Sequence, residues 1–158
     1  MIAPEIIQNL PDFSDFREGE IRTLAALAEE EWHEAGEFIF REGDQACAIY
    51  LMLHGQVEIM VNINAEGTQR AAVMTVKPGE IFGWPSLVEP NRQTTSARCI
   101  TPVSVAAIPA RYLQALAGVY CTLRFRLLEK SCQVASARLR VTRAQLLNAL
   151  GGSHLEGH

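Results

Sequence analysis

The chain has 158 residues, of which 48% are hydrophobic and 20% are charged, with a formal net charge of −4. This length, together with these hydrophobic and charged fractions, predicts one globular domain with a substantial apolar core. No apolar run approaches the roughly 18 residues that cross a bilayer, and the N-terminus lacks the basic and apolar segments of a secretory signal. We therefore expect a cytoplasmic protein without contact to a membrane.

The charge is divided unevenly along the chain. Residues 1–60 carry 13 acidic and 3 basic side chains, whereas residues 61–158 carry 5 acidic and 11 basic ones. The basic excess lies mostly in the last helical region, where it is typical of the solvated flanks of an amphipathic helix that meets an acidic partner. The cysteines and histidines show no metal-binding or redox spacing, so we expect no metal site and no disulfide bonds.

The first predicted helix covers residues 10–31. Its apolar side chains, Phe16, Ile21, Leu24 and Leu27, recur at spacings close to 3.6 residues. Short β-rich runs follow up to residue 109, separated by glycine-containing turns. This spacing predicts an antiparallel, jelly-roll-like β-roll, and together with the helices it indicates an α+β fold.

The chain is predicted to be helical again from Ala110 to about Leu150, and Gly151 and Gly152 are expected to end the helix. One stripe of this helix has residues alternately four and three apart, the pattern of a helix that packs along a partner helix. We expect a parallel homodimer, and the alternative is a helix that packs only on its own β-roll. We call this stripe the helix seam; its central residues are Phe125, Leu128, Cys132, Ala135, Leu139, Thr142 and Leu146.

The segment 77–100, which we call the cradle, has the pattern of a phosphate-binding loop. Gly79 and Gly83 allow the chain to bend, and Pro85 suits the first turn of a short helix. Hydroxyl side chains follow this turn. Trp84, however, stands where the short helix begins, and no acidic residue lies beside it.

Segments along most of the chain carry a family resemblance. They read LPDFSDF, AGEFIFREGD, IYLMLHGQVEI, VKPGEIFG, SLV, TTSAR and RLRVTRAQLL. With them, the chain resembles the cyclic-nucleotide-binding domain of catabolite-activator and FNR-type bacterial regulators, over about residues 10–150. The resemblance implies a β-roll with an N-terminal helix at 10–110, dimerisation helices at 111–150 and a flexible tail at 151–158.

In that family the cradle reads Phe-Gly-Glu, followed by a Leu and then an Arg. The Glu accepts hydrogen bonds from the ribose, and the Arg pairs with the cyclic phosphate. Phe82, Gly83 and Leu87 match this pattern, whereas Trp84 takes the place of the Glu and Gln93 that of the Arg. The resemblance therefore implies that cyclic-nucleotide binding is weakened or lost.

The cradle leaves two further points open. Arg92 precedes the position of the family's Arg by one residue, which turns its side chain to the opposite face unless a bulge restores it. The Trp84 ring either fills the vacated ribose site and closes the cradle, which we favour, or stacks on a flat ligand. The candidate ligand-binding residues are Phe82, Gly83, Trp84, Ser86, Leu87, Arg92, Gln93, Thr94 and Thr95.

These patterns predict a non-enzymatic sensor or regulatory module that signals through its dimer helix to a protein partner. No catalytic motif is present, and no DNA-binding helix-turn-helix follows the last helix, so we expect neither catalysis nor direct DNA binding. We expect no cofactor, although a cyclic nucleotide or another small anion stays open as a ligand. The alternatives are a structural interaction module with a closed pocket and a sensor of a different small ligand.

Overall fold

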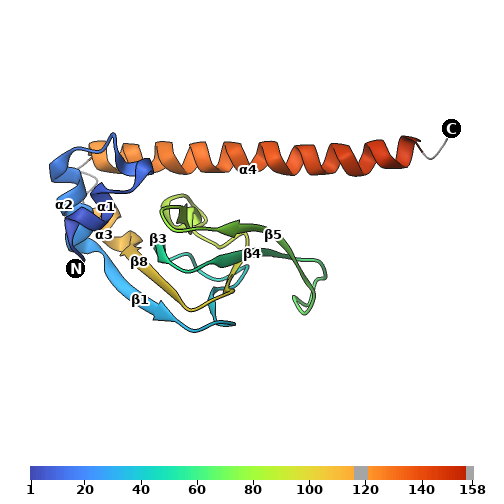
Figure 1. The fold of residues 1–158 in the computed structure, drawn as a ribbon, viewed down its shortest axis with the longest axis horizontal. Coiled ribbons are helices and arrows are strands. Elements are labelled where there is room, and N and C mark those ends of the chain that lie inside the picture. The colour runs from blue at the N-terminus through green and yellow to red at the C-terminus, as the bar shows by residue number, and fades with distance from the viewer. Residues whose placement is uncertain (116–120, 156–158) are drawn as a thin grey trace.

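The computed structural model describes residues 1–115 and 121–155, with side chains described up to residue 151. Figure 1 shows a β-roll with short helices gathered at one end and one long helix, α4 (Cys121–Leu155), that runs along the roll and projects beyond it. None of the helices within these ranges is both long and apolar enough to cross a membrane.

The N-terminal region contains two short helices and a 3-10 turn instead of one continuous helix. They are α1 (Pro4–Gln8), η1 (Pro11–Phe13) and α2 (Glu18–Leu27). The predicted helix over 10–31 is therefore wrong at both ends, because α2 begins at Glu18 and the chain from Glu29 is a strand. That strand pairs with β8 along its whole length, and this ladder overrides the helix propensity of the glutamates.

The strands form two antiparallel sheets, ordered β1-β8-β3-β6 and β2-β7-β4-β5. This arrangement confirms the predicted α+β class with an antiparallel β-roll. The strands are β1 (Glu29–His33), β2 (Phe38–Phe40), β3 (Ala48–His54), β4 (Val57–Asn62), β5 (Arg70–Val76), β6 (Ile81–Phe82), β7 (Ser96–Cys99) and β8 (Val103–Pro109).

The central strands of the first sheet, β3 and β8, are buried on both faces. One face joins the second sheet in a cluster that contains Met52, Phe82 and Val105. The other face packs against the helices in a cluster that contains Ile49 and Ile108 of the sheet. Strand β8 is consequently buried from Val103 to Ile108, which explains its unbroken run of small and apolar residues.

The C-terminal helical region comprises α3 (Ala110–Ala115) and α4; residues 116–120 lie outside the described ranges. Leu123, Leu127 and Ser131 of α4 are buried, so this stripe holds the helix against the rest of the chain. The prediction that Gly151 and Gly152 end the helix is wrong, since α4 continues to Leu155. A glycine within a helix costs only about 1 kcal/mol, which a long helix tolerates.

Candidate functional site

The cradle begins with a turn that only glycine fits. Gly83, between β6 and the 3-10 turn η2 (Trp84–Leu87), has a φ of +78°, in the left-handed region. A Cβ at this position would lie 2.7 Å from Cδ2 of Tyr50 and 3.0 Å from the carbonyl oxygen of Ala48. The turn is therefore fixed both by backbone conformation and by close packing on β3.

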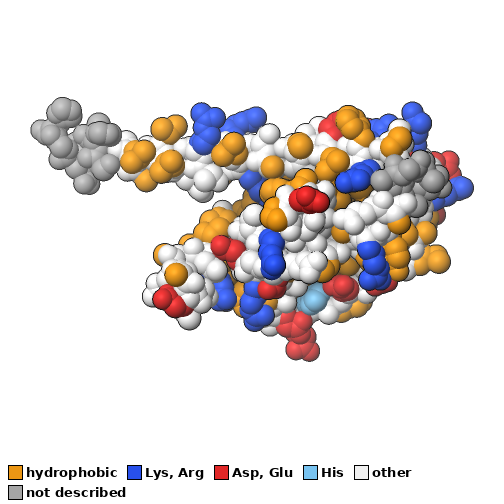
Figure 2. Space-filling model, turned by 180° about the vertical axis from the view of Figure 1, so that it is seen from behind, with side chains coloured by type: hydrophobic (Ala, Val, Ile, Leu, Met, Phe, Trp, Pro, Cys, Tyr) orange, Lys and Arg blue, Asp and Glu red, His pale blue; other side chains and the backbone are white. Residues whose placement is uncertain are grey.

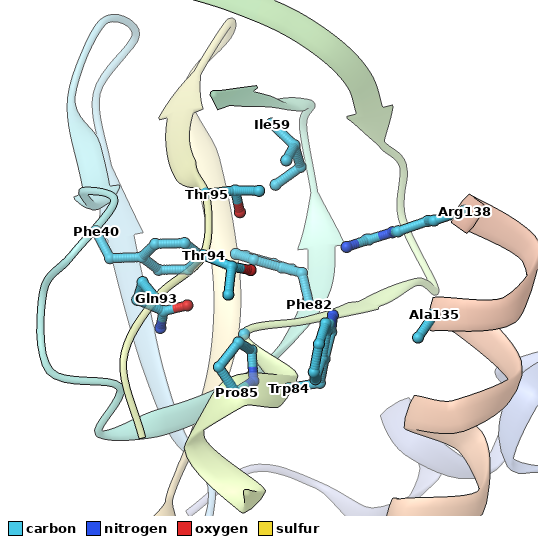
Figure 3. Close-up of a pocket in the computed structure, with 11 residues that line it drawn as sticks. Phe40, Ile59, Phe82, Trp84, Pro85, Gln93, Thr94, Thr95, Ala135 and Arg138 are labelled. Atoms are coloured by element: carbon cyan, nitrogen blue, oxygen red, sulfur yellow. The ribbon is translucent and has the colours of Figure 1, made fainter. Parts of the chain in front are cut away.

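A cavity of about 140 Å³ opens between the cradle and α4, as Figure 3 shows. Its inner end is aromatic: Phe82 stacks on Tyr50 with ring centroids 5.1 Å apart, and Phe40 lies 6.1 Å from Phe82. Burial, with a contribution from Glu31, raises the pKa of Tyr50 to about 12, so its hydroxyl stays neutral. The lining residues are Phe40, Ile59, Phe82, Gly83, Trp84, Pro85, Gln93, Thr94, Thr95, Ala135 and Arg138.

The structure brings most of the candidate ligand-binding residues to this cavity. Phe82, Gly83 and Trp84 line it from one side of the cradle. Gln93, which is only 4% exposed, lines it together with the two residues that follow, Thr94 and Thr95.

Three candidates lie elsewhere. Arg92 is exposed, and its Nη1 donates a hydrogen bond to the carbonyl oxygen of Gly43 at 3.1 Å. Leu87 is buried in the apolar cluster under the helices. Ser86 is fully buried and borders a different cavity beside Asn91, and its backbone N–H donates to the carbonyl oxygen of Gly83. Neither Arg92 nor Ser86 therefore lines the cavity at Trp84.

The interpretation of Trp84 as a plug that closes the cradle is wrong. The side chain is half-buried, and the indole N–H has no hydrogen-bond partner recorded among the described residues. Figure 3 places the indole on the α4 side of the cavity, near Pro85 and Ala135. The ring thus forms a wall and leaves the space beside Phe82 open.

Sequence reasoning missed the contribution of α4. Ala135, assigned to the helix seam, is half-buried and lines the cavity, and Arg138 extends from the helix toward Phe82 and Thr94 (Figure 3). The signal was present in the sequence: Arg138 follows Leu127, Ser131 and Val134 at helical spacing, on the stripe that faces the roll. Burial lowers the pKa of Arg138, while Glu80 acts in the opposite direction.

The rest of the helix seam lies mainly at the surface of the single chain. Phe125, Leu139 and Leu146 are 65%, 60% and 57% exposed, and Cys132 and Thr142 are exposed as well, whereas Leu128 is half-buried. Figure 2 shows apolar side chains and Lys and Arg side chains along α4, including the part that projects beyond the roll. Dimerisation through this seam stays a prediction.

Metal ligation finds no support in residues 1–115 and 121–155, where no group of three or more His, Cys, Asp or Glu side chains is placed to hold an ion. All four cysteines are free, and Cys99 alone among them is buried.

Comparison with protein families matches the model of the cyclic nucleotide-binding domain to residues 30–120. A solved structure of a putative cyclic nucleotide-binding protein from Geobacter metallireducens is similar with a TM-score of 0.76 and 30% identity, over 88% of this chain and 99% of that one. The Thermus thermophilus catabolite activator protein is similar in fold with a TM-score of 0.70 and 23% identity, over 89% of this chain and 63% of that one.

Among curated proteins, the Drosophila melanogaster cGMP-dependent protein kinase, isozyme 1, is 22% identical over 140 residues. The alignment covers 88% of this chain and 18% of the kinase, so the chain spans less than a fifth of that protein's length.

Proposed function

The chain belongs to the cyclic nucleotide-binding domain family, and from that premise we propose that it is a non-enzymatic sensor whose cradle binds a small ligand and whose helix α4 carries the response. Two copies of the chain associate through the helix seam, and the resulting homodimer passes the change in α4 to an output protein.

The observation that carries this proposal is the composition of the cavity wall. Trp84 and Gln93 come from the cradle, whereas Ala135 and Arg138 come from α4. A ligand in the cavity contacts both parts, and its binding free energy therefore depends on where α4 lies. Ligand binding and helix position are coupled for this reason.

Cyclic nucleotides bind this cradle more weakly than they bind a cradle with the family's Glu and Arg. The corresponding positions hold the uncharged Trp84 and Gln93, and Arg92 is bonded to Gly43 outside the cavity. A hydrogen bond to a charged group contributes about 1.5–3 kcal/mol, so two such losses weaken binding by roughly 10²- to 10⁴-fold.

The exposed apolar side chains of the helix seam favour a second candidate, an interaction module that responds to no ligand. The open cavity argues against it. Ligand-binding sites are cavities with a few polar side chains in their lining, as here. An interaction module that binds no ligand does not require such a cavity.

The two tryptophans allow a direct test. Trp84 lines the cavity, and Trp32 is 71% exposed on β1. In the variant Trp32→Phe, Trp84 is the sole indole, and its fluorescence reports on the cavity during titration with cyclic AMP or cyclic GMP up to roughly 10 mM, a range that covers weak binding.

The matched control is Trp84→Phe, in which only Trp32 emits. Sensor function predicts a saturable change in the first variant and none in the second. A protein that forms dimers but shows no saturable response from Trp84 with either nucleotide would favour the interaction module.

A further inference from the structure

A second cavity, of about 300 Å³, lies beside the 3-10 turn η2 and shares no lining residue with the cavity at Trp84. Its volume is at the lower end of the range for small-molecule sites, about 300–1,000 Å³. No lining residue within the described part of the chain is acidic. The polar side chains and the thiol at its wall belong to Gln45, Cys47, Ser86, Asn91, Arg111 and Gln114. This composition suits a polar ligand that carries negative charge.

The hydroxyl of Ser86 indicates that a ligand belongs in this second cavity. Ser86 borders the cavity and is fully buried, and its Oγ makes no hydrogen bond with the residues that the structure describes. Its backbone, in contrast, is satisfied: the N–H donates to the carbonyl oxygen of Gly83 at 3.2 Å, and the carbonyl oxygen accepts from Nδ2 of Asn91 at 3.0 Å. A buried hydroxyl without a partner is unfavourable, and a ligand amide that bonds to it recovers this cost.

The thiol of Cys47 lies at the wall of the same cavity, together with the guanidinium of Arg111. Cys47 is exposed, and its backbone carbonyl accepts a hydrogen bond at 2.9 Å from the N–H of Ala110, the residue before Arg111 in α3. The hydroxyl of Tyr112 is the largest cause of the raised pKa of Arg111, and smaller contributions come from Glu29 and Cys47. The sulfur and the guanidinium therefore interact electrostatically.

We propose that Cys47 is a site of S-thiolation, at which a low-molecular-weight thiol with a carboxylate and amide groups occupies this cavity as a mixed disulfide. Arg111 pairs with the carboxylate, because only its Nη2 is used in the protein, in a hydrogen bond to the hydroxyl of Tyr112 at 3.2 Å. The Ser86 hydroxyl and the amide of Gln114 bond to the amide groups of the ligand. This inference is independent of what binds in the cavity at Trp84.

The reaction is a thiol–disulfide exchange, and the oxidant is the disulfide form of the small thiol. The Cys47 thiol loses its proton to water, and the thiolate attacks one sulfur of the small disulfide. The S–S bond of the reagent breaks as the new S–S bond to Cys47 forms, and the leaving thiolate takes up a proton. Cys47 is thereby oxidised and the leaving half of the reagent is reduced, and an excess of the reduced small thiol reverses the step.

The competing explanation is that Cys47 reacts only as any exposed thiol does. Cys121 provides the comparison within the same molecule, since it is also exposed and lines neither of the two cavities. The test measures the rate of modification at Cys47 and at Cys121 by peptide mass spectrometry. Two reagents are used: glutathione disulfide, which carries carboxylates and amide groups, and cystamine, a disulfide that carries ammonium groups and no carboxylate.

At Cys47 the ratio of the glutathione disulfide rate to the cystamine rate should exceed the ratio at Cys121. Arg111→Gln should lower the ratio at Cys47 by about 3- to 10-fold, because it removes an ion pair with one reagent and a repulsion with the other. Arg111→Lys should keep most of the ratio, since it keeps the charge. Arg140→Gln, which removes an exposed guanidinium of α4, should match the parent protein.

Protection by S-methylglutathione, which cannot form a disulfide, tests whether the cavity itself binds the small molecule. At up to roughly 10 mM it should slow the alkylation of Cys47 by iodoacetamide and leave that of Cys121 unchanged. Ser86→Ala should raise the concentration needed for half-protection by about 3- to 10-fold, because one hydrogen bond to the ligand is lost.

Two results would overturn the inference. One is a ratio of rates at Cys47 that equals the ratio at Cys121 or is unchanged in Arg111→Gln. The other is the absence of protection by S-methylglutathione, which would mean that Cys47 reacts without a binding site. Neither result bears on the nucleotide titrations of Trp84, so the sensor function is tested separately.

Discussion

Glu20 of α2 and Arg126 of α4 form an ion pair that joins the N-terminal helices to the long helix. Nε of Arg126 lies 3.1 Å from Oε1 and 3.0 Å from Oε2 of Glu20, whose side chain is only 7% exposed. Nη1 of Arg126 also donates to the backbone carbonyl of Asp15 at 3.0 Å, and Lys130 lies 3.5 Å from the Asp15 carboxylate. The acidic N-terminal half and the basic C-terminal half thus meet within one chain.

Replacing Arg126 with Gln should lower the free energy of unfolding by about 2–3 kcal/mol, because it leaves the buried Glu20 carboxylate with only the exposed Arg17, whose Nε lies 3.9 Å from Oε1 of Glu20. Urea denaturation measures this loss. The matched control is Arg22→Gln, which breaks the pair with Glu18 at 2.6 Å, where both side chains are about 70% exposed. That change should cost less than about 1 kcal/mol. Equal effects of the two variants would contradict the anchoring role of Arg126.

Alkaline pH should destabilise the protein through Cys99. Burial, with a contribution from Glu37, raises the pKa of this thiol from 9.0 to about 11. The folded state holds the proton more tightly than the unfolded state, so this contribution to stability is complete below pH 9 and is lost as the pH rises toward 11. Cys99→Ala should reduce the fall in unfolding free energy across this window.

Cys47→Ala is the control for the alkaline prediction, because Cys47 is exposed. It should leave in place most of the fall in unfolding free energy that Cys99→Ala removes. If Cys99→Ala showed the same alkaline slope as the parent protein, titration of the Cys99 thiol would not be its source.

Leu139→Glu should convert the dimer to a monomer, since it places two like charges opposite each other in the apolar helix seam. Sedimentation velocity at roughly 50 µM, well above the dissociation constant of a modest interface, measures the change. Gln133→Glu adds the same charge at an exposed position outside the seam and should stay dimeric. If the parent protein sediments as a monomer, the prediction of dimerisation through the helix seam is wrong.

The reactivity of the Cys132 thiol is a second measure of whether the dimer forms through the helix seam. Cys132 belongs to the seam and is exposed in the single chain. Its thiol should therefore react more slowly with a thiol reagent in the parent dimer than in Leu139→Glu, while the exposed Cys47 should react alike in both. Equal rates at Cys132 would place the dimer contact elsewhere.

Trp84→Ala should destabilise the protein much less than Phe82→Ala. Phe82 is fully buried, and truncating such a ring costs about 3–5 kcal/mol. Trp84 borders an open cavity and is half-buried, so less packing is lost when its ring is removed. Thermal and urea unfolding compare the two variants. Similar losses would mean that the Trp84 ring is part of the core after all.

The sequence predicts the β-roll well because its turns and strands are locally encoded. Gly83, for example, stands at a left-handed turn, where its own backbone conformation demands glycine. The prediction from sequence fails at Glu29–Glu31, which was assigned to a helix and is a strand. These residues pair with β8 residues nearly 80 positions away, and pairing of this kind carries no local signal. For the same reason Trp84 and Gln93 of the cradle were predictable as site residues. The helical spacing of Arg138 indicates only that it lies on the face of α4 toward the roll, and the packing of α4 on the roll is what brings it to the cavity.

The double variant Trp84→Glu with Gln93→Arg tests whether the cradle backbone is still fit for a cyclic nucleotide. Both positions line the cavity, so the pair of side chains found in the family would face the same space. We expect a gain of at least about 100-fold in affinity for cyclic AMP, since each restored charged contact contributes roughly 1.5–3 kcal/mol. Isothermal titration calorimetry measures the gain.

Each single variant should gain much less affinity for cyclic AMP than the pair, because it leaves half of the ligand's polar edge unmatched. Gln93→Arg alone should also lower the melting temperature, because it places a second guanidinium in the cavity with Arg138, and like charges at close range repel. Trp84→Glu supplies a carboxylate between them, so the double variant should be more stable than Gln93→Arg. A double variant that folds but does not bind cyclic AMP would show that the backbone around Pro85 has diverged, and that the cavity selects a ligand of a different shape.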